Sequence, residues 1–269
     1  MEMPLFIARD KMIFKWFRHR RRARLHAADF PASDESILLE GFPLYRCLPK
    51  PLREKLQNHI KVFLDEKHFE GCMGFELTQE VKLLIAAQAC LLLLGKENTE
   101  YTTLKSILVY PDTYQARRTE MAPGGVVSET QQAVLGQSWE CGTVALSWKS
   151  TQRGAANMHD GRNVVLHEFA HQLDQATGQA NGLPKLRSAS RYAAWKRVMS
   201  EEYERLQDRV EAGRRTVMDA YGATHPAEFF AVASECFFEK PEQLKRARPA
   251  LYDQLQLFYQ QDPSIYLQG

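Results

Sequence analysis

The sequence predicts an α+β protein that is mostly helical and has a small mixed sheet lying over one central helix. The first observation is the order of patterns: helical segments come first, short β-type runs follow, and helices return toward the end. The second is an apolar helix around residue 167 whose polar residues share one face. The third is composition, because 44% hydrophobic and 25% charged residues are typical of a globular protein with a packed core.

Residues 1–35 are expected to form a poorly ordered basic arm. Lysine and arginine are dense over 15–24 and lie beside Phe14, Trp16 and Phe17. The alternative for residues 12–24 is weak attraction to an anionic membrane surface or to nucleic acid. Met12 is a second candidate for the first residue. The remainder, 36–269, is expected to be one domain, with a helical part over about 40–100 and a part over about 101–269 that carries the candidate site.

Two helices and three short strands are predicted before the central helix. Pro51 begins a helix with one apolar stripe, and Thr78 caps a buried helix over 79–94 that ends at Gly95. Proline and glycine make 111–125 a loop. Short apolar or β-branched runs predict strands at 106–110, 133–135 and 143–148.

The central helix is predicted over about 161–177, with Asp160 as its N-cap and Gly178 as its C-terminal stop. A polar loop follows at 179–190. Apolar periodicity then predicts three more helices, at about 190–210, 226–239 and 249–261.

His167, Glu168 and His171 form the pattern H-E-x-x-H on the central helix, the signature of a zinc peptidase. Residues four apart share a helix face, so both imidazoles can bind one tetrahedral zinc ion at about 2.0–2.1 Å. Glu168 can then take a proton from an activated water. We therefore expect one Zn²⁺ per chain. The alternative is a structural histidine pair.

A catalytic zinc ion needs a third protein ligand, and the helix predicted at 226–239 offers two candidates. Glu228 and Glu235 are seven residues apart on an otherwise apolar helix, so they share a face about 10.5 Å apart along the axis. The pattern predicts one metal ligand and one hydrogen-bond partner for a ligating histidine, without deciding between them. Asp174, on the face of His167 and His171, is a further candidate partner, and His225 is a less favoured ligand.

Charge and cysteine content exclude some functions. A net charge of +2 gives no reason to expect direct nucleic-acid binding by the whole chain. The longest apolar run, 83–94, contains Gln88 and is too short to span a bilayer. The cysteines are odd in number and form no C-x-x-C pair, which favours free thiols in a reducing cytoplasm. They are Cys47, Cys72, Cys90, Cys141 and Cys236.

Several motifs together make the chain resemble the Mlc titration factor A family of bacterial cytoplasmic zinc metallopeptidases. They are His-Glu-Phe-Ala-His-Gln-Leu-Asp at 167–174, Asp-Ala-Tyr at 219–221 and Pro-Ala-Glu-Phe-Phe-Ala-Val-x-Ser-Glu at 226–235. The likeness extends to Gly-Phe-Glu-Leu at 74–77, Leu-Val-Tyr-Pro at 108–111, Gly-Gln-Ser-Trp at 136–139 and Phe-Tyr-Gln-Gln-Asp-Pro at 258–263. It covers roughly residues 40–263.

The resemblance implies a gluzincin, with a zincin-like domain similar to the anthrax lethal factor peptidase domain. It implies that His167, His171 and Glu228 are zinc ligands and that Glu168 is the general base. Glu235 then becomes the candidate hydrogen-bond partner, and Tyr221 the donor to the developing oxyanion.

The same resemblance implies two functions. One is aminopeptidase-like cleavage of short peptides, for which a strand such as 143–148 is expected to pair with the substrate backbone. The other is binding of a repressor like Mlc in the regulation of sugar uptake. The alternative is a non-catalytic, repressor-sequestering protein whose zinc site is structural or vestigial.

Overall fold

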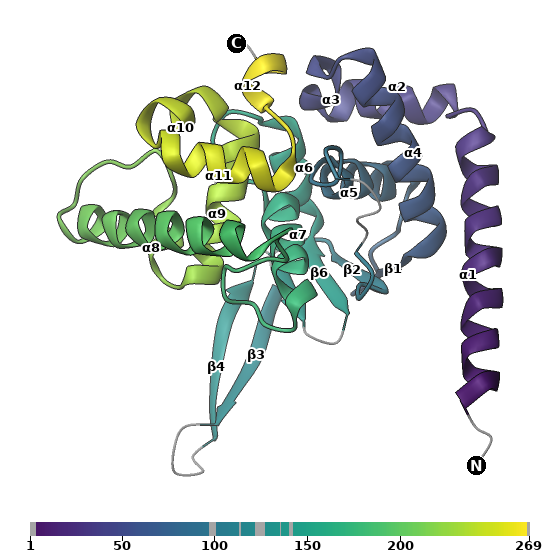
Figure 1. The fold of residues 1–269 in the computed structure, drawn as a ribbon, viewed down its shortest axis with the longest axis horizontal. Coiled ribbons are helices and arrows are strands. Elements are labelled where there is room, and N and C mark those ends of the chain that lie inside the picture. The colour runs from purple at the N-terminus through teal and green to yellow at the C-terminus, as the bar shows by residue number, and fades with distance from the viewer. Residues whose placement is uncertain are drawn as a thin grey trace.

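The fold places a small mixed sheet beside a group of packed helices (Figure 1). The structure is a computed structural model, and it describes residues 4–96, 101–112, 114–121, 127–134, 136–139 and 142–267. Helices dominate these residues, as the sequence predicts. The predicted fold class, a mostly helical α+β protein with a small mixed sheet, is confirmed.

The main sheet has four strands in the order β1-β2-β6-β5. β1, β2 and β6 are parallel, and β5 is antiparallel to β6. β6 is buried on both faces beyond its first residue, whereas β2 buries the alternate residues Ile107 and Val109 and leaves the others partly exposed. Ile107 and Val144 pair with no exposed surface. The bounds are β1 His68–Gly71, β2 Ser106–Tyr110, β5 Gly136–Trp139 and β6 Thr143–Ser147. β1 lies outside the strands predicted from the sequence.

The helices before the sheet build one side of the core. Thr78 caps α5 by accepting a hydrogen bond from the Val81 N–H, as predicted. The α5 helix is nearly all buried, and Gln88 is accommodated there because its side chain donates to the Leu84 carbonyl at 2.8 Å. The bounds are α2 Ala32–Gly41, α3 Pro43–Cys47, α4 Lys50–Glu66 and α5 Gln79–Leu91.

The helices after the sheet pack around α7, which contacts α5, α9, β5 and β6. This arrangement puts the sheet against the helix that carries His167, as predicted. Aromatic rings such as Trp195, Phe230 and Phe258 fill the space between α8, α9 and α11. The bounds are α6 Trp148–Ala156, α7 Val164–Asp174, α8 Ala189–Glu211, α9 Pro226–Glu239, α10 Pro241–Ala247, α11 Pro249–Tyr259 and α12 Pro263–Tyr266.

A two-stranded ribbon, β3 Tyr114–Met121 and β4 Val127–Val134, extends away from the helices (Figure 1). The prediction of a loop over 111–125 is therefore wrong for residues 114–121, while residues 113 and 122–125 lie outside the described part of the chain. That prediction rested on Pro111 and on Pro123–Gly125, which flank and follow β3 rather than interrupt it. Residues 133–134 of the strand predicted at 133–135 are the end of the longer β4, and residue 135 lies outside the described part of the chain.

The basic N-terminal segment is a helix, α1 Pro4–Ala27, where the sequence analysis expects a poorly ordered arm. It lies along one side of the molecule against α4 (Figure 1). Arg22 forms two hydrogen bonds with the Glu66 carboxylate, at 2.6 and 2.7 Å, and Arg21 pairs with Asp65 at 2.6 Å. The boundary between an N-terminal arm, 1–35, and a domain, 36–269, stays a prediction. The contact of residues 12–24 with a membrane surface also stays a prediction.

No helix among the described residues is long and apolar enough to cross a membrane.

Candidate metal centre

Helix α7 positions the H-E-x-x-H residues, and Asn163 determines where it begins. The Asn163 side-chain oxygen accepts hydrogen bonds from the Val165 and Leu166 N–H groups. The prediction that Asp160 caps this helix is wrong, because Asp160 instead accepts from Asn157 and Arg162 in the preceding loop. The helix is therefore shorter than the predicted 161–177.

The C-terminal end of the helix also differs. A short 3₁₀ turn, η1 Gln175–Thr177, follows α7. Gly178 then ends this turn in the left-handed region with a φ of 97°, a conformation that favours glycine. The predicted stop at Gly178 thus ends the 3₁₀ turn and not the α-helix itself.

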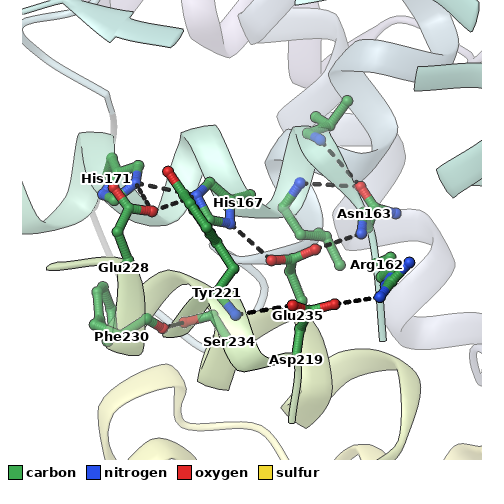
Figure 2. A network of polar contacts seen from close by, with 12 residues as sticks. Arg162, Asn163, His167, His171, Asp219, Tyr221, Glu228, Phe230, Ser234 and Glu235 are labelled. Carbon is green, nitrogen blue, oxygen red and sulfur yellow. Dashed lines mark hydrogen bonds and ion pairs between the residues drawn. The ribbon is translucent and has the colours of Figure 1, made fainter. Parts of the chain in front are cut away.

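Three side-chain atoms from α7 and α9 converge on one point (Figure 2). The Nε2 atoms of His167 and His171 are 3.2 Å apart. The Glu228 Oε2 atom is 2.9 Å from the first and 3.4 Å from the second. Helical spacing produces the histidine pair, since residues four apart lie one turn above each other.

The separations match the requirements of a tetrahedral zinc ion. Metal–ligand bonds of 2.0–2.1 Å put neighbouring ligands about 3.3–3.4 Å apart in a tetrahedron. If all three atoms act only as acceptors they repel one another, so either a proton shared between His167 and Glu228 or a metal ion must lie among them. The donor set of two histidines and one glutamate is typical of a catalytic zinc site. These residues therefore fit a zinc ion.

Glu235 controls the orientation of His167 from the other side of the ring. Its Oε1 atom is 2.7 Å from the His167 Nδ1 atom, and its second oxygen accepts the Asn163 N–H (Figure 2). A carboxylate in this place keeps the proton on Nδ1 and leaves Nε2 free to bind a metal. Burial lowers the pKa of His167, but the contacts with Glu228 and Glu235 more than offset it and raise that pKa well above 6.5.

Glu168 is almost completely buried, with 5% of its surface exposed. Burial raises the pKa of its carboxyl group, while the neighbouring His167 and His171 act to lower it. A carboxyl group whose pKa is raised holds a proton more readily, which suits it to accept and return one.

Tyr221 lies beside the convergent atoms but belongs to a separate element, the 3₁₀ helix η2 Ala220–Ala223. Its ring centre is 6.0 Å from that of His167, and half of its surface is exposed (Figure 2). Asp219 begins η2 by accepting the Tyr221 N–H and forms an ion pair with Arg162 at 2.5 Å. That ion pair links the Tyr221 loop to the segment just before α7.

Two other candidates lie away from the convergent point. Asp174 is fully buried and accepts a hydrogen bond from the Gly182 N–H at 2.6 Å, so it organises the loop after α7. His225 is the N-cap of α9, because its Nδ1 atom accepts the Ala227 N–H at 3.2 Å. Neither contributes to the three-atom group formed by His167, His171 and Glu228.

Comparison with known proteins places this geometry in a family. The family model described as Glucose-regulated metallo-peptidase M90 matches residues 15–260. The chain belongs to the M90 metallopeptidase family. Membership of this family agrees with the resemblance to the Mlc titration factor A family. It also agrees with the group of His167, His171 and Glu228, which could hold a metal ion.

Named relatives of this M90 protein cover most of its length. An uncharacterized protein of Synechocystis is 41% identical over 246 residues, which are 91% of this chain and 90% of that protein. Proteins named Mlc titration factor A from Yersinia pestis and Yersinia pseudotuberculosis are 32% identical over 226 residues, 83% of each chain.

Three residues that hold the site of this M90 protein together were not predicted from the sequence: Arg162, Asn163 and Glu239. Asn163 donates from Nδ2 to Glu239 at 3.0 Å, and Glu239 also accepts the Arg162 N–H at 3.1 Å. The spacing of Glu235 and Glu239, four residues apart on an apolar helix, is a signal that they share a face. Asn163 was detectable as a preferred N-cap residue just before the apolar run.

Proposed function

We propose that this chain is a zinc-dependent peptidase that hydrolyses short peptides with an aminopeptidase-like preference. The observation that carries the proposal is the convergence of His167, His171 and Glu228 next to a buried Glu168. A site used only for structure needs no additional buried carboxyl group. The M90 family supports the peptidase class, and the sequence resemblance supports the preference for short substrates.

The side chains divide the reaction between them. Zinc held by His167, His171 and Glu228 would supply Lewis-acid polarisation of a water molecule and of the substrate carbonyl. Glu168 accepts the proton of the attacking water and returns it to the leaving amine. The Tyr221 hydroxyl donates a hydrogen bond to the oxygen that becomes negative as the carbonyl is attacked, an interaction made only in the transition state.

The strand that pairs with a peptide cannot be the one expected from the sequence. β6, within the predicted 143–148, is hydrogen-bonded to β2 on one side and to β5 on the other, so it has no free edge. The edge on this side of the sheet is β5, Gly136–Trp139, which contacts α7. A substrate that adds a strand would therefore pair with β5.

We propose a second function, binding of a transcriptional repressor like Mlc in the regulation of sugar uptake. The relatives named Mlc titration factor A, 32% identical over 83% of this chain, support it. If repressor binding is the sole function, the zinc site is structural or vestigial. Binding that survives both zinc removal and loss of Glu168 would show that it is independent of catalysis.

A cytoplasmic location also belongs to this proposal. The four cysteines whose positions are described, Cys47, Cys72, Cys90 and Cys236, are all free thiols. Free thiols are typical of a reducing compartment.

The test replaces Glu168 by Gln and measures hydrolysis of aminoacyl and short-peptide reporters together with bound zinc. We expect turnover to fall by about 10²–10⁴-fold at unchanged zinc content, because the amide cannot accept the proton. The matched control is Glu201→Gln, which makes the same chemical change on the exposed face of α8. Undiminished turnover of Glu168→Gln at equal zinc content contradicts the mechanism. If zinc-loaded wild-type protein cleaves nothing in the panel, repressor binding becomes the better proposal.

A further inference from the structure

A pocket of about 740 Å³ lies between the start of α8 and the end of α11, two helices that run side by side (Figure 1). Its lining includes two arginines, Arg187 and Arg191, and the side-chain amides of Gln256, Gln260 and Gln261. The pocket is widely open to solvent, and the exposed Leu257 also lines it. Its volume is within the range of small-molecule sites, about 300–1,000 Å³.

The two arginines of this pocket are not held in ion pairs. Arg187 donates a hydrogen bond to the neutral Gln260 side chain at 2.9 Å. In the part of the chain that the structure describes, neither Arg187 nor Arg191 forms an ion pair with an acidic residue. Asp262 also lines the pocket, but it accepts the Tyr252 hydroxyl at 2.6 Å and lies 3.8 Å from the Lys245 ammonium.

A third cation, Lys96, lies close behind the pocket. Its ammonium group is buried over the Phe258 ring, 3.2 Å from the ring centre. Burial, together with the charge of Arg187, lowers the pKa of Lys96 to about 7. A bound anion would reduce the repulsion between Lys96 and Arg187.

The backbone around the pocket is tightly constrained. Gln260, the residue that ends α11, has a φ of 54°, in the left-handed region that non-glycine residues rarely adopt. Gly95 packs so closely on α11 that any side chain there would collide with the carbonyl oxygens of Tyr259 and Gln260. On the opposite wall, Arg191 is in the first turn of α8, where the helix dipole favours negative charge.

We propose that this pocket binds a small, hydroxyl-bearing phosphate ester. Two guanidinium groups match the charge of a phosphate dianion and its bidentate hydrogen-bond geometry. The volume exceeds what a bare phosphate needs. Gln256 donates to Asp262 and Gln260 accepts from Arg187, so the Gln256 oxygen and the Gln260 amide nitrogen remain to bind hydroxyl groups, whereas Gln261 is buried and bonded to Leu91 and Tyr266. The site is distinct from the metal centre, because it shares no residue with it.

The test is titration calorimetry on the full chain at constant ionic strength with glucose 6-phosphate, glucose and inorganic phosphate as probes. We expect saturable binding of glucose 6-phosphate, weaker binding of phosphate and none of glucose. Arg191→Gln and Arg187→Gln should each weaken the ester by about tenfold or more. Arg197→Gln, an exposed arginine further along α8, is the matched control and should leave binding unchanged.

Three results would overturn the proposal. The first is no saturable binding of the ester up to about 10 mM. The second is equal affinity in Arg191→Gln, Arg187→Gln and Arg197→Gln proteins that all keep the wild-type circular dichroism spectrum. The third is Arg191-dependent retention on phosphatidylglycerol vesicles with no binding of the soluble ester, which would assign the phosphate to a lipid headgroup.

Discussion

His167 has a carboxylate at each of its ring nitrogens, Glu228 at Nε2 and Glu235 at Nδ1. Both carboxylates come from α9, so one helix determines the position and the tautomer of a side chain on another. Asn163 completes the connection, because its N–H is bonded to Glu235 and its side chain to Glu239. The geometry of the proposed ligands therefore depends on a residue that touches none of the convergent atoms.

Asn163→Ala should destabilise the protein by about 2–3 kcal/mol. The substitution removes the cap of α7 and leaves buried Glu239 without its Nδ2 donor. Urea denaturation measures the change. The control is Asn181→Ala, which removes an exposed side-chain hydrogen bond to the Leu183 N–H and should cost less than about 1 kcal/mol. Equal losses in both variants would contradict the assigned role of Asn163.

Tyr221→Phe should lower kcat by about a hundredfold with little change in KM or in zinc content. The phenol donates only when negative charge develops on the substrate, so its loss affects the transition state more than the bound substrate. Steady-state kinetics with the peptide reporters measure both constants. The control is Tyr192→Phe on α8, which removes the hydroxyl group that accepts a hydrogen bond from the Leu186 N–H. An unchanged kcat for Tyr221→Phe would exclude the oxyanion role.

At the scale of elements, the molecule depends on pairs of helices held by polar contacts near their ends. α7 and α9 are joined through Asn163, Glu235 and Glu239. In the same way α1 is joined to α4 by the ion pairs of Arg21 and Arg22. The second junction contains a buried titratable group, His59 of α4, whose Nε2 atom has no hydrogen-bond partner among the described residues.

The α1–α4 junction should make stability depend on pH between about 6.5 and 4. Burial lowers the pKa of His59 to about 4, and the positive charges of Lys55, His26 and Arg22 act in the same direction. In this range the unfolded chain binds a proton that the folded chain does not, so stability falls as pH falls. The contribution is fully present above about pH 6.5 and amounts to about 1–3 kcal/mol.

Unfolding free energies of wild type and His59→Gln at several pH values measure this effect. The variant should lose less stability than wild type as the pH falls from about 6.5 to 4. His159→Gln, at an exposed histidine in the loop before α7, should behave as wild type. Parallel pH profiles for wild type and His59→Gln would show that His59 is not the group responsible.

At the scale of the whole molecule, a metal ion would join the two sides of the α7–α9 interface. Removal of zinc by a chelator should lower the unfolding midpoint by about 5–10 °C, since a ligand at a hundred times its Kd contributes about 2.7 kcal/mol. Differential scanning calorimetry with and without chelator measures it. Glu228→Gln should abolish this zinc-dependent shift, and Glu201→Gln should retain it. A shift that persists in Glu228→Gln would place the stabilising metal elsewhere.

The fold class and the pairing of His167 with His171 could be predicted because they depend on local periodicity. A spacing of four on one apolar helix puts both imidazoles on one face in any tertiary context. The third zinc ligand could not be predicted in this way. The helix pattern allows either Glu228 or Glu235, and only the family resemblance favours Glu228. In the structure Glu228 reaches Nε2 and Glu235 reaches Nδ1, as that resemblance implies.

The remaining differences depend on contacts between distant segments. β1 is only four residues long and is stabilised by pairing with β2, 38 positions later, so its own sequence carries little signal. The strand order β1-β2-β6-β5 could not be predicted from the sequence patterns of single strands. In this order β6 is a central strand and β5 is an edge strand. The capping role of Asn163 depends in part on α9, which supplies its other partners.

The separation of α7 and α9 along the chain has a consequence for biosynthesis. The contact between His167 and Glu235 joins residues 68 positions apart. A ribosome adding about 5–20 residues per second completes that interval in about 3–14 s. Until Glu228 is added, 61 positions after His167, both histidines exist without either carboxylate partner. We therefore expect the nascent chain to acquire its metal late, after α9 has emerged and packed against α7.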